Sequence, residues 1–258
     1  MANSEPHKMI AYRVFGNGYP VVFLHGFLES KTMWESICNE EEFCAILIDL
    51  PGHGESGEQL QAAHSMRAMA KEIKRVIDAL GIQDYVVVGH SMGGYVGLEL
   101  IQMDARCQRI LLLNSNFWSD SVEKKRDRKR VADIVVTNKT LFLYEAIPNL
   151  FVDPNAHDSH VKALIQEASE MSAEAIAACS IAMSKREDHS GWVSENANII
   201  TVVQGTADQI VPESLMKEKL GTVDCTYVSI EGTGHMAHLE STELVKNVLG
   251  EFIGMKTA

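Results

Sequence analysis

Short runs of uninterrupted apolar residues, separated by segments with helical periodicity, place the narrowest limits on how this chain can fold. The clear runs cover residues 21–24, 44–48, 85–88, 110–113 and 199–203, followed by a weaker sixth at 225–230. Runs that are apolar throughout suit strands buried on both faces. Apolar residues recur at helical spacing over residues 66–80, 96–103 and 244–253. This alternation predicts an α/β fold with a mostly parallel central sheet flanked by helices.

The alternation stops between residues 117 and 192, where helical patterns replace strand patterns. This segment carries a basic run at 124–130 and an amphipathic stretch at 159–183. We expect the basic run to be a solvated helix face rather than an anion site. A helical insertion at this point would lie over the carboxyl ends of the strands, where open α/β sheets bind ligands. The sequence thus predicts a core of residues 1–116 and 193–258, with a helical lid of residues 117–192 after the sixth strand.

The pentapeptide Gly89-His90-Ser91-Met92-Gly93 joins an apolar run to a helical pattern. A G-x-S-x-G sequence between a strand and a helix predicts a sharp turn that projects the serine hydroxyl above the sheet. The N-terminus of the following helix then points toward developing negative charge. Ser91 is therefore the candidate nucleophile.

A serine hydroxyl needs a base, and the base needs an acid that orients it. In this arrangement the chain order is serine, acid and histidine. Asp208 follows the run that ends at residue 203, and His235 follows the run that ends at residue 230. We predict that His235 is the base and that Asp208 orients it. The alternatives for the two roles are His90, His238, Asp224 and Glu231.

Two backbone N–H groups should stabilise the oxyanion that forms when a serine attacks a carbonyl. Met92 N–H, at the start of the helix, is one candidate. Phe27 N–H, in the loop after the first apolar run, is the other. The expected substrate pocket is apolar and rich in methionine. Its candidate walls are Phe27, Phe117, Trp118, Met171, Met183 and Met236.

The composition opposes several classes of partner. Thirty-five acidic against 23 basic residues leave a net charge of −12, which argues against binding to nucleic acid or to an anionic membrane. The five cysteines lack CxxC spacing, which predicts free thiols, and no metal motif is present. Residues 1–7 lack the pattern of a secretory signal, and no apolar stretch has the length of a membrane span. We expect a cytoplasmic protein, monomeric or a small homo-oligomer, that acts on a small molecule.

Together these motifs resemble the α/β-hydrolase superfamily, and in particular its compact lidded bacterial esterases, enol-lactone hydrolases and carbon–carbon bond hydrolases. The resemblance extends through His25-Gly26-Phe27, the segment 49–56, the serine turn, Gly205 to Asp208, and Gly234-His235. It implies a hydrolase without a cofactor. Relatives that act in menaquinone biosynthesis have an arginine soon after the serine turn that binds carboxylates, whereas this chain has Tyr95, which lowers the expectation of a strongly anionic substrate.

The leading hypothesis is a serine hydrolase that cleaves a small carboxylic ester, lactone or thioester through an acyl-enzyme on Ser91. The alternative is a carbon–carbon bond hydrolase or lyase that acts on a dienoic or keto acid with the same three residues. Sites for that reaction usually bind the substrate carboxylate with a cationic or amide group, and the candidate cations are Arg126, Arg128 and Arg130. A non-catalytic receptor that kept the fold is a third hypothesis.

Overall fold

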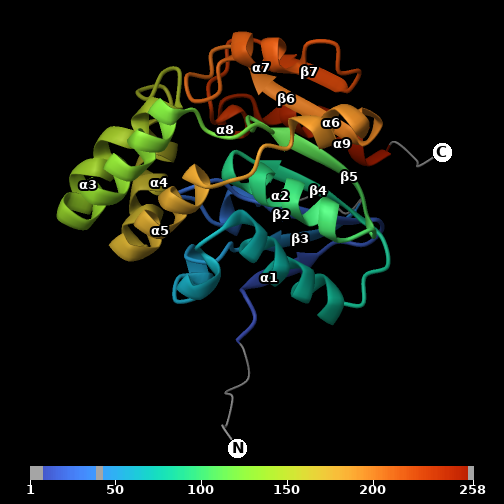
Figure 1. The fold of residues 1–258 in the computed structure, drawn as a ribbon, viewed down its shortest axis with the longest axis horizontal. Coiled ribbons are helices and arrows are strands. Elements are labelled where there is room, and N and C mark those ends of the chain that lie inside the picture. Colours follow the sequence, from blue (N-terminus) through green and yellow to red (C-terminus); the bar gives the residue numbers. More distant parts are fainter. Residues whose placement is uncertain (1–7, 39–42, 255–258) are drawn as a thin grey trace, which may run out of the picture.

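The computed structural model describes residues 8–38 and 43–254. A seven-stranded sheet forms its centre, in the order β1-β3-β2-β4-β5-β6-β7 (Figure 1). The strands are β1 (Tyr12–Phe15), β2 (Pro20–Leu24), β3 (Cys44–Ile48), β4 (Tyr85–His90), β5 (Cys107–Leu113), β6 (Ile200–Gly205) and β7 (Thr226–Ile230). All neighbouring pairs are parallel except β1 and β3. The predicted fold class and all six predicted strands are confirmed.

Strand β1 was not predicted from the sequence. It lies at the edge of the sheet, and three of its four side chains are exposed. An edge strand with little burial carries no continuous apolar run, so its pattern does not stand out from that of a loop.

The two faces of the sheet bury alternate residues of each strand, as strand geometry requires. On β2, for example, Val22 and Leu24 belong to one apolar cluster, and Val21 and Phe23 belong to the other. The first cluster packs against helices α1 (Met66–Ala79), α2 (Met92–Met103), α6 (Ser190–Glu195) and α7 (Glu213–Leu220). The second cluster packs against α8 (Ala237–Glu240) and α9 (Thr242–Gly254).

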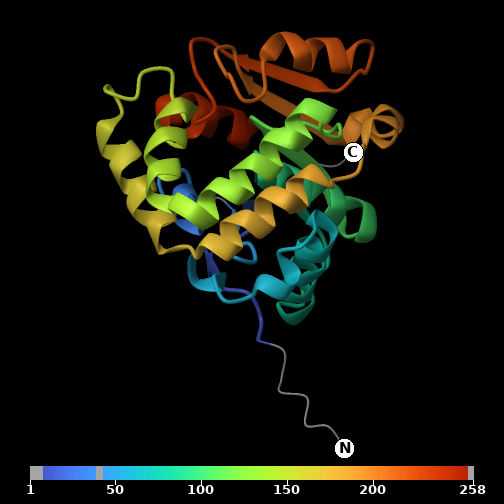
Figure 2. The same cartoon turned by 60° about the vertical axis from the view of Figure 1, so that its left-hand side comes forward.

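Three further helices make up most of the segment predicted as a lid, and their arrangement is clearest in Figure 2. They are α3 (Val122–Ala146), α4 (Asp158–Glu170) and α5 (Ala173–Ser184). Most of their buried apolar side chains belong to a third cluster, whereas Cys179, Ala182 and Met183 of α5 belong to the first cluster that covers the sheet. We call these three helices and the residues that connect them the helical insertion. Whether the insertion opens and closes like a lid stays a prediction.

The insertion follows the fifth strand, so its predicted place after the sixth strand is wrong. The described residues before β2 contain one short strand, β1, and not the two that this count required. The predicted boundary between residues 192 and 193 falls inside α6, whose Val193 packs in a cluster that covers the sheet.

Contacts place the helical insertion at the carboxyl ends of the strands. Ser30, in the loop after β2, donates a hydrogen bond to Glu167 of α4. Gly52, after β3, lies against α5 so closely that a Cβ there would be 3.5 Å from the Cys179 Sγ. After β7, His235 N–H donates to the Leu150 carbonyl at 3.0 Å. The insertion therefore covers the edge where the loops after the strands meet.

None of the helices in the described residues has the length and apolar character needed to cross a bilayer. The five cysteines all lie within the described residues and are free thiols. Residues 1–7, on which the expectation about a secretory signal rests, lie outside the described residues.

Replacement of Phe23 by alanine tests the packing of the second cluster. The Phe23 ring is fully buried, with centroids 5.3 Å from Trp34 and 5.8 Å from Phe43. Phe23→Ala should lower the free energy of unfolding by about 3–5 kcal/mol in urea titrations, because the cavity cannot collapse fully. Val14→Ala, at an exposed position on β1, should cost less than about 1 kcal/mol. Equal losses in the two variants would contradict this account of the core.

Candidate active site

Ser91 occupies the single residue between β4 and α2, in a backbone conformation that is rare for a residue with a side chain. Its φ is 48° and its ψ is −115°. Such a conformation costs on the order of 1–3 kcal/mol and persists only when the surroundings enforce it. The Ser91 N–H donates to the Leu113 carbonyl at 3.0 Å, and its carbonyl accepts from the Ser115 hydroxyl at 2.7 Å. Strand β5 and the loop after it therefore hold the turn.

The glycines on either side of Ser91 allow the chain to turn this tightly. A Cβ at Gly89 would lie 2.6 Å from the backbone of Gly93 and Gly94, and a Cβ at Gly93 would lie 2.6 Å from the His25 carbonyl oxygen. Real Cβ atoms do not approach this closely, so only glycine fits. The turn thus packs directly on the end of β2, where the predicted oxyanion loop begins.

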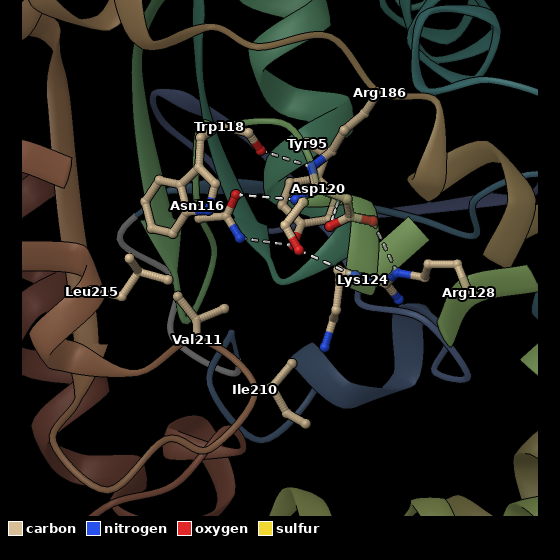
Figure 3. Close-up of a pocket in the computed structure, with 11 residues that line it drawn as sticks. Tyr95, Asn116, Trp118, Asp120, Lys124, Arg128, Arg186, Ile210, Val211 and Leu215 are labelled. Carbon is tan, nitrogen blue, oxygen red and sulfur yellow. Dashed lines mark hydrogen bonds and ion pairs between the residues drawn. The ribbon is translucent and has the colours of Figure 1, made fainter. Parts of the chain in front are cut away.

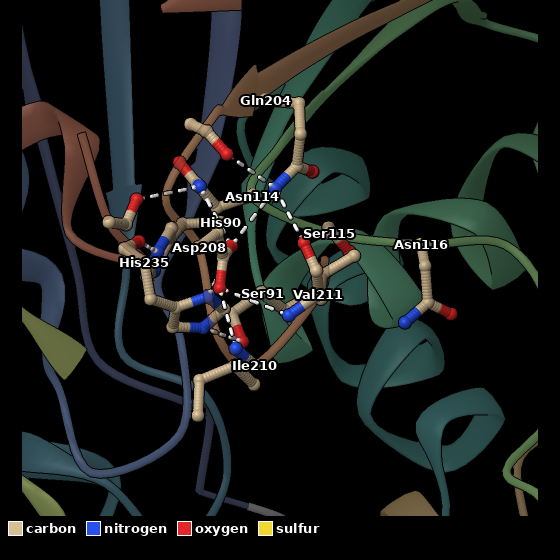
Figure 4. Close-up of polar contacts among 12 residues, drawn as sticks. His90, Ser91, Asn114, Ser115, Asn116, Gln204, Asp208, Ile210, Val211 and His235 are labelled. Carbon is tan, nitrogen blue, oxygen red and sulfur yellow. Dashed lines mark hydrogen bonds and ion pairs between the residues drawn. The ribbon is translucent and has the colours of Figure 1, made fainter. Parts of the chain in front are cut away.

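Ser91, His235 and Asp208 form a continuous chain of hydrogen bonds (Figure 4). His235 Nε2 lies 2.8 Å from Ser91 Oγ, and His235 Nδ1 lies 2.9 Å from Asp208 Oδ2. Because an ionised carboxylate only accepts hydrogen bonds, Nδ1 carries the proton and Nε2 is free to accept the Ser91 proton. The fold brings together three residues that are up to 144 positions apart in the chain.

The Asp208 carboxylate is buried and accepts hydrogen bonds at both oxygens. The backbone N–H groups of Ile210 and Val211 donate to Oδ1 at 2.8 and 3.0 Å. The side-chain amides of Asn114 and Gln204 donate to Oδ2 at 2.9 and 3.1 Å. Burial by itself raises the pKa of this carboxyl, but the neighbouring His235 and these donors lower it to about 2. Asp208 is therefore ionised throughout the neutral range.

Asn114 and Gln204 were not identified from the sequence. Asn114 directly follows β5 and has a φ of 44°, a left-handed conformation that asparagine adopts more readily than most residues. Its side chain also donates to the Gly234 carbonyl at 3.0 Å. Asn114 follows the carboxyl end of β5, and β5 lies beside β4, the strand that ends just before Ser91. This position is the one signal that could have identified Asn114.

The loop after β2 has a fixed hydrogen-bond pattern. His25 Nε2 accepts from Leu50 N–H at 2.9 Å, so the ring is neutral and its Nδ1 donates to the Gly26 carbonyl at 2.8 Å. Burial lowers the pKa of His25, which keeps this form. Among the described residues none accepts a hydrogen bond from Phe27 N–H. Met92 N–H is in the first turn of α2, where a helix supplies no acceptor of its own. Their role as oxyanion donors stays a prediction.

Glu29 and His90 form a buried ion pair next to the loop after β2 and the serine turn. Glu29 Oε2 is 3.0 Å from His90 Nδ1 and accepts from Gly26 N–H at 2.5 Å. His90 Nε2 lies 2.9 Å from the His235 carbonyl oxygen. Both ring nitrogens of His90 therefore face acceptors, and the ring is doubly protonated. The pair joins the loop after β2, the serine turn and the backbone of His235.

The pKa shifts of the pair follow from this geometry. Burial lowers the pKa of His90, but the Glu29 carboxylate and the His235 carbonyl raise it above its ordinary value. Burial raises the pKa of Glu29, but His90 lowers it to about 2. The two shifts describe one interaction and do not add as separate contributions.

The structure does not bring the other candidates for base and acid into the chain of hydrogen bonds from Ser91. Both nitrogens of His90 are engaged away from the Ser91 hydroxyl. His238 is buried against His90, with ring centroids 4.8 Å apart, and burial with that neighbouring charge lowers its pKa to about 3. Asp224 and Glu231 are exposed.

The predicted pocket residues fall into three groups. Trp118 lines a cavity of about 190 Å³ next to Ile210 and Val211, the residues whose N–H groups bind Asp208 (Figure 3). Phe27 is partly exposed and packs between two apolar clusters. The remaining four are buried within those clusters, namely Phe117, Met171, Met183 and Met236. Their contact with a substrate stays a prediction.

Among residues 8–38 and 43–254, no group of three or more histidine, cysteine or acidic side chains is arranged to hold a metal ion. Ser91, His235 and Asp208 are instead hydrogen-bonded to one another, and Asn114 and Gln204 donate to Asp208. The amide oxygens of Asn114 and Gln204 are buried without a hydrogen-bond partner among the described residues.

Comparison with known proteins identifies the family. The family described as alpha/beta hydrolase fold matches residues 19–150. An uncharacterized protein of Mycobacterium tuberculosis is 30% identical over 108 residues, which are 41% of this chain and 31% of that protein. The chain thus aligns with about a third of the length of this relative.

Two solved structures resemble the whole chain. A thermophilic esterase from Thermogutta terrifontis is 28% identical with a TM-score of 0.87, and the match covers 95% of this chain and 92% of that one. The enol-lactonase from Burkholderia xenovorans is 20% identical with a TM-score of 0.82, covering 95% and 96% of the two chains. The second likeness shows the fold alone.

Glu29→Gln tests the buried ion pair because it keeps the shape of the side chain and removes its charge. The folded-state pKa of Glu29, about 2, lies below its ordinary value of 4.5. Its contribution to stability is therefore present above pH 4.5 and lost as the pH falls toward 2. At pH 7 the variant should lose on the order of 3 kcal/mol of unfolding free energy in urea titrations.

The difference in free energy of unfolding between wild type and the Glu29→Gln variant should become smaller as the pH falls from 5 to 3. Glu243→Gln, at an exposed surface pair with Lys246, should cost less than about 1 kcal/mol at pH 7. A difference for Glu29→Gln that stays constant from pH 7 to pH 3 would show that the charge of Glu29 does not stabilise the fold.

Proposed function

The chain belongs to the α/β-hydrolase fold family, and from that premise we propose that it is a serine hydrolase that cleaves a small carboxylic ester, lactone or thioester through an acyl-enzyme on Ser91. One observation carries the proposal. Ser91 Oγ, His235 and Asp208 are joined by hydrogen bonds of 2.8 and 2.9 Å, with the acceptor nitrogen of His235 facing the hydroxyl. This is the geometry that removes a proton from a serine as it attacks a carbonyl.

In the first half of the reaction, Ser91 Oγ attacks the carbonyl carbon while its proton passes to His235 Nε2. The imidazolium that forms is stabilised by the Asp208 carboxylate, which remains ionised. Phe27 N–H and Met92 N–H would donate to the oxygen that becomes negative. The tetrahedral intermediate then collapses, the bond to the leaving alcohol breaks, and His235 gives its proton to that alcohol.

In the second half, a water molecule takes the place of the alcohol. His235 accepts a proton from the water as its oxygen attacks the acyl carbon. Collapse of the second tetrahedral intermediate releases the carboxylic acid, and the Ser91 oxygen regains its proton from His235. Every atom that enters as ester and water leaves as acid and alcohol.

The comparisons support the ester as the bond cleaved. The Thermogutta terrifontis protein is called an esterase, and it is 28% identical to this chain over 95% of its length. A cytoplasmic location, a monomeric or small homo-oligomeric state and action on a small molecule rather than on nucleic acid or a membrane stay predictions from the sequence.

The second candidate function is hydrolysis of a carbon–carbon bond in an acid, and a specific observation favours keeping it. That reaction needs a cation near the reacting serine. Of the three arginines proposed for this role, Arg126 and Arg130 are exposed, but the Arg128 side chain is only 15% exposed and lines the cavity beside Asp208. Arg186, which was not considered from the sequence, is buried in the same cavity.

Ser91→Ala tests the assignment of the nucleophile. The purified variant should hydrolyse p-nitrophenyl esters at less than about a thousandth of the wild-type rate, because no other group can form the acyl-enzyme. A fluorophosphonate probe should label the wild type and not the variant. Equal turnover by the two proteins would refute the proposal. Labelling of the wild type without turnover of any ester would favour the carbon–carbon reaction.

Asp208→Asn tests the role of the carboxylate. An amide at this position can donate to His235 Nδ1 and so stabilise the wrong tautomer, and kcat should fall by about 10²- to 10⁴-fold with little change in KM. Asn114→Ala removes one donor to Asp208 and leaves three, so its loss should be about tenfold or less. Equal losses in steady-state assays of the two variants would mean that Asp208 does not act through its charge.

A further inference from the structure

The cavity beside Asp208 contains more positive than negative charge. Its walls include Lys124, Arg128 and Arg186 but only one carboxylate, that of Asp120. Asp120 lies 2.6 Å from an Arg186 Nη and 3.4 Å from Arg128 Nε, and both partners are largely buried. One carboxylate cannot neutralise three cations, so the cavity attracts anions.

Arg186 and Asp120 form a fixed part of the wall. Arg186 donates to the Trp118 carbonyl at 3.0 Å and to the Met183 carbonyl at 3.0 Å, and its guanidinium lies 4.2 Å from the centre of the Tyr95 ring. With Asp120 at 2.6 Å these contacts occupy most of its donors. Arg128 shares the single carboxylate of Asp120 with Arg186, and among the described residues Lys124 has no ion-pair partner, so the excess positive charge lies at Lys124 and Arg128.

Lys124 and Arg128 are four residues apart on α3 and so lie on the same face of the helix. Both are partly buried, while Lys125, Arg126, Lys129 and Arg130 between and beside them are exposed. The expectation that the basic run is a solvated face is thus wrong for these two positions. Within the described residues Lys124 has no ion-pair partner, and burial together with the Arg128 charge lowers its pKa.

The cavity lies next to the residues that hold the reacting groups, although Ser91, His235 and Asp208 do not themselves line it. Tyr95 is four residues after Ser91 on α2, and Asn116, whose side chain donates to the Tyr95 hydroxyl at 3.1 Å, is next to Ser115, which binds the Ser91 carbonyl. Figures 3 and 4 both draw Asn116, Ile210 and Val211, once with the cations and once with Ser91. The part of the cavity wall formed by Trp118, Ile210, Val211 and Leu215 is apolar.

We propose that this cavity binds an ionised carboxylate at the far end of the substrate, so that the preferred ester is a half-ester of a dicarboxylic acid. Lys124 and Arg128 hold the carboxylate, and the apolar walls contact the methylene chain between it and the scissile ester. The inference rests on the proposed function and names its substrate class. The cations come from the insertion, which explains how an anionic substrate fits a chain that has Tyr95, and no arginine, just after the serine turn.

Monomethyl glutarate and methyl pentanoate provide the test, since they have similar length and differ in the terminal carboxylate. Hydrolysis is followed by pH-stat titration at pH 7.5, and monomethyl succinate and adipate extend the series. Wild-type kcat/KM should be higher for at least one half-ester than for its neutral counterpart, and we call the quotient of these two kcat/KM values the selectivity ratio. Lys124→Met should lower the selectivity ratio at least about tenfold, the effect of losing one charged hydrogen-bond partner. Arg128→Gln should act in the same direction.

Lys125→Met is the matched control, because it removes an adjacent charge that is exposed on the same helix. It should keep the wild-type ratio. A wild-type ratio of one or less across the series, or a ratio that Lys124→Met and Lys125→Met lower equally, would overturn the inference while leaving the esterase proposal intact.

A binding measurement separates the two proposals when no ester is turned over. Titration calorimetry of the Ser91→Ala variant with glutarate and with pentanoate needs no catalysis. Tighter binding of glutarate, weakened at least about tenfold by adding Lys124→Met, supports the carboxylate site even if the reaction is not ester hydrolysis. Equal binding of the two acids, or no binding of glutarate, overturns it.

Discussion

The positive φ of Ser91 is the constraint on which the site depends, because it aims the hydroxyl at the base and begins α2 at the next residue. The conformation is possible only where Gly89 and Gly93 let the turn pack on its own backbone and on the end of β2. That packing also sets the distance from the turn to the loop that holds Phe27. The strained backbone conformation of Ser91 thus positions the nucleophile and both candidate oxyanion donors.

Two buried carboxylates, those of Asp208 and Glu29, lie close to this turn and have different roles. Asp208 faces His235 and fixes which of its nitrogens carries the proton. Glu29 contacts neither reacting atom but binds His90 and the Gly26 N–H, so it connects three loops through one charge. Each carboxylate has a pKa of about 2 because the partners compensate for the cost of burial. Both charges are therefore kept in the buried region beneath the site by the groups that surround them.

The helical insertion adds to this site what the sheet does not provide. The sheet and its loops supply Ser91, His235, Asp208 and their hydrogen-bond partners, whereas α3 and the segment directly after α5 supply the cations of the cavity. A division of this kind allows the reaction to stay the same while the substrate changes with the insertion. It also places the proposed selectivity on residues that no motif identifies.

The sequence by itself determined the fold class, six of the seven strands found in the described part of the chain, and the three residues proposed to react. Buried parallel strands need continuous apolar runs, and a strained turn needs glycines at set positions, so both leave a local pattern. Only the tertiary structure decided which polar residues support them. Glu29 and His90 are 61 residues apart, Asn114 and Asp208 are 94 apart, and Arg186 meets Asp120 across the insertion. Contacts between distant segments depend on how the strands and helices are packed, and no local pattern records them.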